Sequence, residues 1–291
     1  MFDDDNNLNP LLLYQKQIEK ELIKSITLFG NKTKLRDACE YALLNGGKRF
    51  RPAIVFMVSK ALGLNADVTK AAIAVEYLHT ASLIADDLPC MDNDDERRGK
   101  KSLHVVYGEA CALLCSYALI SAGYECLTQN VKDFKGKDAE KRGILSIQNA
   151  SYNTGVLGAT GGQYLDMFAE NQSMDILKEV IFKKTISLFE ISFVLGWLFG
   201  GGKIDELLNV KKAAAHFGMA FQIADDIEDL EQDLKNGHKV NMAVNFGKDK
   251  AFNMVKDEIA SFFETIDALK IDATEFKNVA KALLSQTQKY L

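Results

Sequence analysis

TKAAIAVEYLHTASLIADDLPCMD, residues 69–92, joins an apolar helical stretch to a cluster of acidic residues. Small and apolar side chains recur in it at the three- and four-residue spacing of one helix face: Ala71, Val75, Leu78, Ser82 and Ala85. Pro89 cannot continue a regular helix, so we expect the helix to end at Ala85 and the next residues to loop out. Six residues correspond to about 240° of helical turn, so Asp86 and Asp92 can share a face only with such a bulge.

The same helical spacing extends through most of the 291-residue chain. Only three prolines interrupt it: Pro10, Pro52 and Pro89. No segment shows the alternation of a strand, and no repeat or Ser/Pro-rich linker divides the chain. We therefore predict an all-α protein with a single domain over residues 1–291 and roughly ten helices. Helix ends and connections are predicted at three glycine clusters: Gly46 and Gly47, Gly161 and Gly162, and Gly200 to Gly202.

The composition excludes several classes of protein. Apolar residues make up 47% of the chain, charged residues 26%, and the net charge is −5, so a basic nucleic-acid surface is disfavoured. The five cysteines form no metal-ligand spacing, and the acidic N-terminus does not resemble a transit peptide, which together favour reduced thiols. Apolar runs such as residues 191–199 are shorter than the about 20 residues that span a bilayer. We expect a soluble cytoplasmic protein that binds no nucleic acid.

Two acidic clusters follow apolar helical stretches, one at residues 86–95 and one at residues 225–229. In the second, Asp225 and Asp229 are four residues apart and share a helix face. An isolated acidic run is usually a solvated surface, but carboxylates at a helix C-terminus are unfavourable unless cations lie among them. Both clusters begin with a paired Asp-Asp, and their hard oxygen ligands suit Mg²⁺, which shares its coordination with substrate phosphates. The EF-hand spacing is missing, so a calcium loop fits poorly.

Basic residues stand where a phosphate could bind. Arg97 and Arg98 follow the first acidic cluster directly. Residues 46–52, GGKRFRP, place three cations between a glycine pair and a proline-started helix, where backbone N–H groups help to hold an anion. Lys183 and Lys184 add charge further along the chain. Each basic run alone is more often simply exposed, so these residues gain weight only in combination.

Residues 79–92, with Arg97, Arg98 and His104 behind them, resemble the first aspartate-rich motif of the trans-isoprenyl diphosphate synthases in its longer Asp-Asp-x-x-x-x-Asp form. Residues 221–229, FQIADDIED, resemble the second motif. Further family blocks match in the same order: residues 46–52, Gly161-Gly162-Gln163-x-x-Asp166, and Lys184-Thr185. The similarity runs from about residue 34 to residue 247 and is nearest to geranylgeranyl and farnesyl diphosphate synthases.

The resemblance implies a single-domain isoprenoid synthase fold, a helical bundle around a central cavity. It also implies head-to-tail condensation of isopentenyl diphosphate with an allylic diphosphate, assisted by Mg²⁺. Ionising the allylic C–O bond leaves a carbocation and pyrophosphate, which metal ions and fixed cations stabilise. A dry apolar cavity keeps water from the cation, and pyrophosphate itself is the family's proton acceptor.

The resemblance also assigns roles to individual residues. Asp86, Asp92 and Asp225 would ligate Mg²⁺, with three further carboxylates nearby or acting through water: Asp87, Asp226 and Asp229. Three cations would contact the allylic diphosphate: Arg97, Lys184 and Lys239. Four residues would hold isopentenyl diphosphate: Lys48, Arg51, His79 and Arg98. Thr185 and Gln222 would line the reacting centre. A lone helix histidine such as His79 is more often structural, and only the family match favours a ligand role.

Product length depends on the residues one and two turns before Asp86, because one helical turn and one isoprene unit are both about 5 Å long. The floor of the cavity would be formed by Leu78, Ala81 and Ser82. Small side chains there leave room, which favours geranylgeranyl over farnesyl diphosphate. The alternative, that Ala81 and Ser82 only allow close helix packing, is equally open.

The chain departs from the family pattern at three places. Ala85 stands where many relatives have His, and Ser116-Tyr117 replaces a Gly-Asp pair. The segment after Asp229 is shortened, and the family Lys-x-Thr-Tyr-Pro block reads KVNMA, residues 239–243. Two alternatives therefore stay open: a non-catalytic regulatory subunit of a heteromeric synthase and a class I terpene cyclase. We expect a homodimer formed through apolar helices such as residues 110–127.

Overall fold

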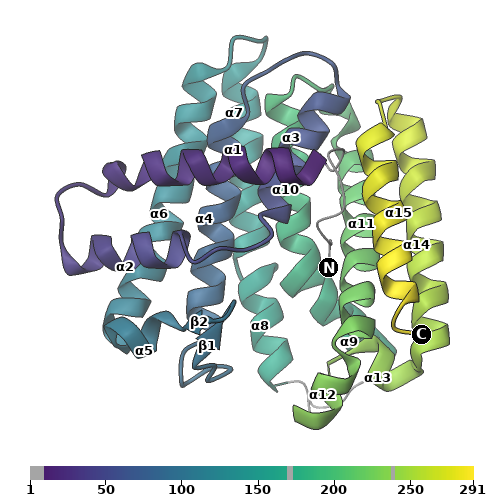
Figure 1. Cartoon of the computed structure of the whole chain (residues 1–291). Coiled ribbons are helices and arrows are strands. Elements are labelled where there is room, and N and C mark those ends of the chain that lie inside the picture. The colour runs from purple at the N-terminus through teal and green to yellow at the C-terminus, as the bar shows by residue number, and fades with distance from the viewer. Residues whose placement is uncertain (1–9, 169–172, 237–239) are drawn as a thin grey trace.

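The computed structural model describes residues 10–168, 173–236 and 240–291, which form a helical bundle (Figure 1). Eleven α-helices have ten residues or more: α1 (Pro10–Ser25), α2 (Lys34–Leu43), α3 (Phe50–Ala61), α4 (Thr69–Asp86), α6 (Glu109–Asp133), α7 (Ala139–Thr154), α8 (Ala159–Phe168), α10 (Ser187–Phe199), α11 (Leu207–Glu228), α14 (Lys248–Leu269) and α15 (Thr274–Gln288). Shorter helical segments connect them: η1 (Ile26–Phe29), α5 (Leu103–Tyr107), α9 (Met174–Val180), η2 (Ile181–Ile186), η3 (Ile204–Glu206), α12 (Leu230–Asn236) and α13 (Met242–Phe246). The predicted all-α fold is confirmed.

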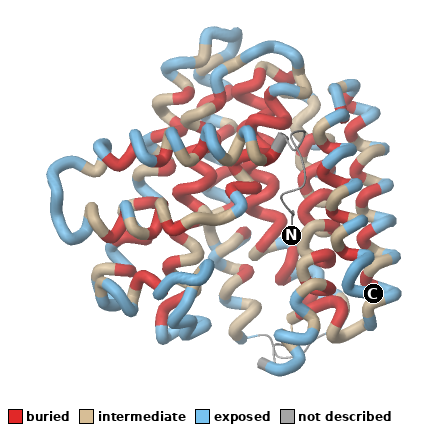
Figure 2. The backbone as a smooth tube through the Cα atoms, viewed as in Figure 1, coloured by how far each residue is buried: buried red, intermediate tan, exposed pale blue. Residues whose placement is uncertain are grey.

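Helix α10 forms the centre of the bundle. All thirteen of its residues are buried, and it packs against α3, α4, α7 and α11 (Figure 2). Phe193 contacts Phe217 of α11 and Phe276 of α15, so aromatic rings join the middle of the bundle to its C-terminal helices. Burying such rings removes large apolar areas from water and stabilises the fold.

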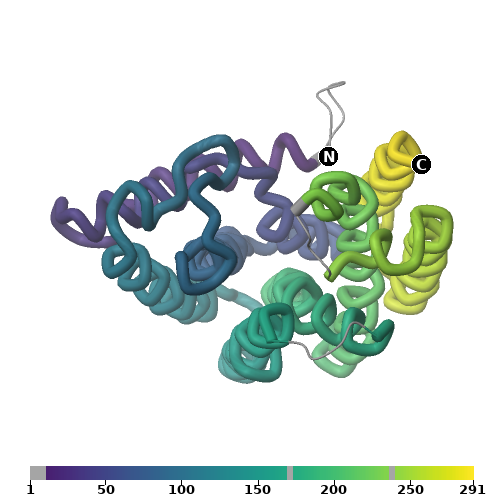
Figure 3. The backbone as a smooth tube through the Cα atoms, turned by 90° about the horizontal axis from the view of Figure 1, so that it is seen from below, coloured from purple at the N-terminus to yellow at the C-terminus, as the bar shows by residue number. Residues whose placement is uncertain are grey.

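The core continues across α11. Phe221 and Phe263 pack against both of the apolar clusters that the described residues form. The helices surround α10 when the bundle is seen from below (Figure 3). The single domain over residues 1–291 stays a prediction. Helix α8 contributes no residue to either cluster and packs against η2 and α9.

The first acidic cluster contains the bulge that Pro89 led us to expect. Helix α4 ends at Asp86, and the Asp92 N–H donates to the Asp86 carbonyl at 2.9 Å. The intervening residues therefore loop out and bring the two aspartates back together. The structure adds a short hairpin that the sequence did not predict, in which β1 (Glu96–Arg97) pairs antiparallel with β2 (Lys100–Lys101).

A second local feature positions the basic residues before α10. Helices α9 and α10 are continuous through η2, a π-helical turn that contains Lys183, Lys184 and Thr185. A π-helical turn widens the helix and changes the direction of its side chains, and such turns are frequent at functional sites.

The prediction of a helix end at Gly161 and Gly162 is wrong, because both residues lie inside α8. Glycine is needed there for close packing. A Cβ atom on Gly162 would lie 2.3 Å from the Lys184 nitrogen, so only glycine lets α8 approach the π-helical turn so closely.

Of the described helices, α6 alone is long and apolar enough by composition to cross a membrane, and 39% of its most apolar window is buried. Helix α6 packs along α4 and contacts α2, α5 and α7, as a core helix of a bundle does. Its opposite face exposes Leu113, Leu114 and Tyr117.

Candidate active site

An apolar pocket of about 420 Å³ begins at Asp86 and lies between α4, α6 and α8. Lys184 and Gln163 lie at its polar end. Its remaining wall includes all three predicted floor residues, Leu78, Ala81 and Ser82. A carboxylate and an ammonium group at the mouth of an apolar cavity suit a ligand with a charged head and a hydrocarbon tail.

The substituted Ser116 contributes to this pocket. Its hydroxyl donates to the Ala81 carbonyl at 2.9 Å and fastens α6 to α4 at the predicted floor. Ala85, the other substitution on this side, also lines the pocket. Both departures from the family pattern therefore lie in the wall of the cavity, where they affect its size.

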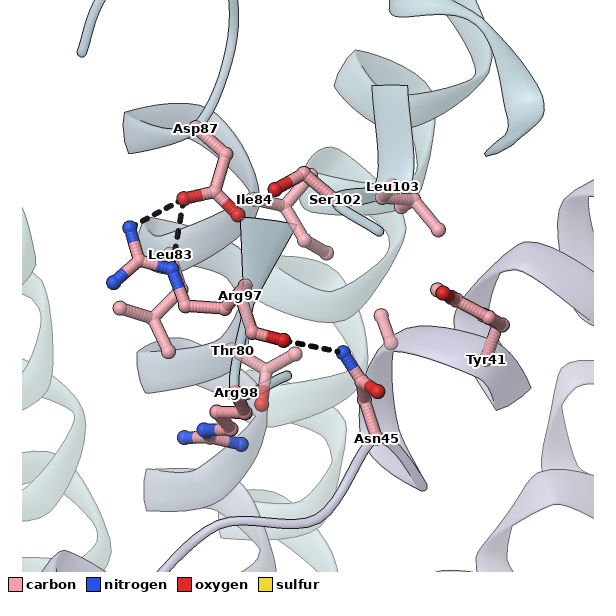
Figure 4. A pocket seen from close by; sticks show the side chains of 11 residues that line it. Tyr41, Asn45, Thr80, Leu83, Ile84, Asp87, Arg97, Arg98, Ser102 and Leu103 are labelled. Carbon is pink, nitrogen blue, oxygen red and sulfur yellow. Dashed lines mark hydrogen bonds and ion pairs between the residues drawn. The ribbon is translucent and has the colours of Figure 1, made fainter. Parts of the chain in front are cut away.

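Asp87 faces away from that pocket and pairs with Arg97 (Figure 4). The Arg97 Nε donates to Asp87 Oδ1 at 2.9 Å, and a second guanidinium nitrogen donates to the same oxygen. Asp87 is 4% exposed. The Asp87 carboxylate thus forms an ion pair that orients Arg97, and its role as a nearby or water-mediated ligand stays a prediction.

Helix α8 connects Asp92 to Lys184. Gln163 donates to Asp92 Oδ1 at 3.1 Å, and Lys184 donates to Asp166 Oδ2 at 2.5 Å. Gln163 and Asp166 were noted in the sequence only as part of a family block. Their spacing of three residues puts both on one face of α8, which is the signal that could have identified them as site residues.

Charge around Asp86 is unbalanced in the absence of a cation. The pKa of Asp86 is raised to about 6, mainly by burial and also by the nearby Asp92 and Asp87, while Lys184 and Arg97 act against this shift. Burial lowers the pKa of Lys184, but the carboxylates of Asp166, Asp86 and Asp92 outweigh this effect and raise the pKa above its ordinary value. A bound divalent ion would relieve the repulsion between these carboxylates.

The second cluster has the same character at Asp225. Burial and the neighbouring Asp229 raise the pKa of Asp225 to about 6, opposed by Lys48 and Arg51. Helices α4 and α11 both end at the same end of the bundle, next to the hairpin and α12 (Figure 1). The π-helical turn touches both clusters, because Lys184 faces Asp86 while Thr185 donates to Gln222 of α11 at 2.8 Å.

Asp226 plays a different part from its neighbour. Its Oδ1 accepts from Gln222 at 2.8 Å and its Oδ2 accepts from the Met242 N–H at 2.7 Å, and the side chain is buried. Asn241 donates to the Asp226 carbonyl at 2.8 Å. Asp226 therefore holds the start of α13 against α11, and its role as a nearby or water-mediated ligand stays a prediction.

Replacing Asp226 by Asn should therefore cost stability, by about 1–3 kcal/mol, since one backbone or amide donor would lose its buried acceptor. Urea unfolding at pH 7.5 measures this. Asp229→Asn, at an exposed position on the same helix end, is the matched control and should unfold within about 0.5 kcal/mol of the parent. Equal unfolding curves for Asp226→Asn and the parent protein would contradict the anchoring role.

The basic loop before α3 contains one residue that sequence reasoning missed. Arg49 and Glu76 form an ion pair whose side chains are each 1% exposed, and Arg49 also donates to the Leu43 carbonyl at 2.6 Å. Lys48 is exposed beside it. Arg49 was noted in the sequence only as one of three cations in this run, without a role of its own, and the fold shows that it is buried and structural.

The other predicted diphosphate residues lie close together. An Arg51 guanidinium nitrogen lies 3.5 Å from His79 Nε2. Burial and the facing arginines lower the pKa of His79 well below its ordinary value, so the ring is neutral and offers a hydrogen bond rather than a charge. Arg98 donates to the Gly46 carbonyl at 2.5 Å. Gly47 has a φ of 122°, a backbone conformation that favours glycine, and a Cβ atom there would displace the Arg98 guanidinium group.

The donor set fits Mg²⁺ only in partnership with a ligand. Within residues 10–168, 173–236 and 240–291, no three His, Cys, Asp or Glu side chains are grouped closely enough to hold a metal ion by themselves. Asp86 and Asp92 on one side, and Asp225 and Asp229 on the other, offer hard oxygens. Mg²⁺ commonly takes one or two carboxylates and completes its shell with water and substrate phosphates. Lys239, the remaining predicted phosphate ligand, lies outside the described residues.

Comparison with known proteins agrees with this geometry. Residues 32–250 match the family model described as polyprenyl synthetase. The chain belongs to the polyprenyl synthetase family. Among its relatives in this family, the farnesyl diphosphate synthase of Bacillus subtilis is 34% identical over 230 residues, which cover 77% of this chain and 77% of the relative. The trans-isoprenyl diphosphate synthase resemblance is confirmed.

Plant relatives are longer. Heterodimeric geranylgeranyl pyrophosphate synthase large subunit 2 of Arabidopsis thaliana is 34% identical over 227 residues, 76% of this chain and 59% of that protein. A geranyltransferase of Legionella pneumophila has the same fold, with a TM-score of 0.83, 25% identity and 96% of each chain covered. This polyprenyl synthetase chain thus matches bacterial relatives over most of their length and the first plant relative over little more than half.

Proposed function

We propose that this protein is a trans-prenyltransferase that condenses isopentenyl diphosphate with an allylic diphosphate and releases pyrophosphate. The observation that supports this most strongly is the 420 Å³ apolar pocket, which begins at Asp86 and Lys184 and continues past Ala81. A charged head and an isoprenoid tail match the two ends of that pocket.

Two sets of side chains would each bind one of the two diphosphates. Lys184 would bind the allylic diphosphate, and Arg97 would join it from its pair with Asp87. Arg51, Arg98 and neutral His79 would hold isopentenyl diphosphate beside it. Fixed cations of this kind stabilise the negative charge that develops on the leaving group. The apolar wall would exclude water from the allylic cation while the double bond attacks.

Mg²⁺ is the proposed cofactor. When bound, it would act as an electrophile that stabilises the departing pyrophosphate. Asp86, Asp92, Asp225 and Asp229 would hold it together with the substrate oxygens. Pyrophosphate, which the reaction itself releases, would accept the proton lost from the new chain.

Geranylgeranyl diphosphate is the proposed product, with farnesyl diphosphate as the second candidate. Purified protein should be incubated with Mg²⁺, labelled isopentenyl diphosphate and, in turn, dimethylallyl, geranyl and farnesyl diphosphate. A C20 product that EDTA abolishes supports the proposal. A product that stops at C15 supports the proposed condensation but contradicts the proposed chain length. If the folded protein elongates none of the three primers, the proposal of catalysis is wrong.

Ala81→Phe should shorten the product by at least one isoprene unit. The Ala81 side chain lines the pocket about one turn before Asp86, and a phenyl ring there would fill the path of the growing chain. Overpacking should cost about 1–3 kcal/mol of stability, so folding is checked by circular dichroism. Ala81→Ser adds a single oxygen and is the matched control, expected to keep the parent product. An unchanged product with Ala81→Phe would show that the floor lies elsewhere.

Two other functions fit less well. A regulatory subunit that does not catalyse has no need for buried carboxylates whose pKa is raised, yet Asp86 and Asp225 both have this property. A class I terpene cyclase binds one diphosphate, whereas the Arg51–His79 contact offers a second anion site beside the first. Both features favour the two-substrate reaction.

The proposed assembly is a homodimer through α6 and α7. Their outer faces expose large apolar residues that a bundle of this size would otherwise leave in water: Leu113, Leu114, Tyr117, Ile120, Ile144 and Ile147. Sedimentation equilibrium of the parent and of Tyr117→Lys distinguishes a dimer from a monomer or a lipid-bound form.

We further propose a cytoplasmic location, supported by five cysteines that remain free thiols. Fractionation of cells that express the tagged protein tests this location.

A further inference from the structure

The hairpin that carries Arg97 and Arg98 needs support beyond its own two-residue strands. Its turn has positive φ at both central positions, 56° at Arg98 and 73° at Gly99, as in a type I′ turn. A non-glycine residue in this conformation costs about 1–2 kcal/mol. The turn directs Arg98 onto Gly46, so contacts from the rest of the fold must stabilise it.

One set of contacts lies in a small pocket beneath the hairpin, where a few polar side chains lie among mainly apolar ones (Figure 4). The pocket lies between α2, α4 and the hairpin and has a volume of about 30 Å³. One water molecule needs roughly 10–15 Å³ by this measure, so about two could fit. Asn45, Thr80 and Ser102 line it, each from a different segment of the chain.

Three polar side-chain atoms of residues that line the pocket are unsatisfied. Asn45 Oδ1, Thr80 Oγ1 and Ser102 Oγ are buried and have no hydrogen-bond partner within the described ranges of the chain. A helical threonine usually donates to the carbonyl three or four residues earlier, and Thr80 makes no such bond there. Leaving a buried polar atom unpaired costs about 1–3 kcal/mol, so such atoms usually bind ordered water.

The remaining contacts of the pocket reach the hairpin itself. The Asn45 amide donates to the Arg97 carbonyl at 3.4 Å. Ser102, 1% exposed, presents its hydroxyl beside the Asp87 carboxylate that holds the Arg97 guanidinium. The pocket therefore contacts both the backbone and the ion-pair partner of Arg97.

We propose that this pocket binds one or two ordered water molecules, and that Asn45, Thr80 and Ser102 are thereby positioning residues for Arg97 and Arg98. The water joins α2 and α4 to the hairpin and fixes the position of the segment that carries the two arginines. This inference rests on the proposed function only for its effect on substrate binding, since the water site itself is independent of any reaction.

Thr80→Val and Thr80→Ser form the matched pair that tests the proposal. Valine keeps the shape of the side chain and removes its hydroxyl, whereas serine keeps the hydroxyl. In the full-length protein, Thr80→Val should raise KM for isopentenyl diphosphate several-fold with kcat nearly unchanged, and Thr80→Ser should behave as the parent. The melting temperature gives a second test. If the pocket holds no water, the Thr80 hydroxyl is unsatisfied, and removing it in Thr80→Val would raise the melting temperature.

A crystal structure at high resolution gives the direct readout. We expect density for water within hydrogen-bond distance of Asn45 Oδ1 and Thr80 Oγ1 in the parent, and its loss in Thr80→Val. An empty pocket, or equal KM values for the two variants, overturns the proposal. If the parent forms no product, affinity for inorganic pyrophosphate with Mg²⁺, measured by calorimetry, replaces KM, so failure of the proposed function is distinguished from failure of the water site.

Discussion

Asp86→Asn is expected to lower kcat/KM for chain elongation by at least about 10³-fold while the protein stays folded. Asp86 lies at the mouth of the apolar pocket and faces Lys184, so its charge is needed where a cation and a diphosphate would meet. The amide keeps the shape of the side chain and removes that charge. Kinetics with saturating Mg²⁺ and the melting temperature in EDTA measure the two effects.

The melting temperature should equal or exceed that of the parent. Burial raises the folded-state pKa of Asp86 to about 6, above its ordinary value, so the charged form destabilises the folded state near neutral pH. The folded protein binds this proton more tightly than the unfolded chain, and its contribution to stability therefore grows as the pH falls through about 6. An uncharged amide removes the penalty at every pH.

Asp95→Asn is the matched control. Asp95 lies in the same loop with its side chain 85% exposed, and the same substitution there should change kcat/KM less than about twofold. A loss of activity at Asp95 equal to that at Asp86 would mean that the general charge of the loop matters, and would contradict a specific role for Asp86.

The sequence predicted the helical architecture and the bulge after α4 because both follow from local rules. Helical spacing of apolar residues and the missing N–H of Pro89 act over a few residues and are visible in the chain. The return of Asp92 to Asp86 follows from them directly.

The roles within each acidic pair were not predictable in the same way. Asp86 and Asp87 are adjacent and chemically identical, and so are Asp225 and Asp226. They differ only in their tertiary partners. Arg97 donates a hydrogen bond to Asp87, and the Met242 N–H donates one to Asp226. Consecutive residues of a helix point about 100° apart, so the two members of each pair meet different neighbours in the fold.

Arg49 and Gly162 show the same limit for long-range packing. A basic run looks uniform in the sequence, yet Lys48 is exposed while Arg49 pairs with Glu76, which lies 27 positions later. Glycine pairs usually mark helix ends, yet Gly162 is inside α8 because the π-helical turn of a distant segment approaches it. Neither partner lies within the window that local patterns describe.

Glu76→Gln is expected to destabilise the protein by about 3–5 kcal/mol, the usual cost of leaving one charge of a buried ion pair without its partner. The Arg49 and Glu76 side chains are each 1% exposed, so water cannot replace the lost carboxylate. Arg49 is also the N-cap residue of α3, in a left-handed conformation, next to the exposed Lys48. Loosening it should disturb the basic loop together with the fold.

Chemical unfolding at pH 7.5 measures the change in free energy, and Glu21→Gln is the matched control. The Glu21–Lys24 pair lies on the surface of α1, where the same substitution should cost less than about 1 kcal/mol. The double variant Arg49→Met with Glu76→Gln should recover part of the loss, since no unpaired charge then remains buried. If Glu76→Gln unfolds like Glu21→Gln, the buried pair contributes no more than a surface one, and the basic loop must be held by Arg51 and Arg98 instead.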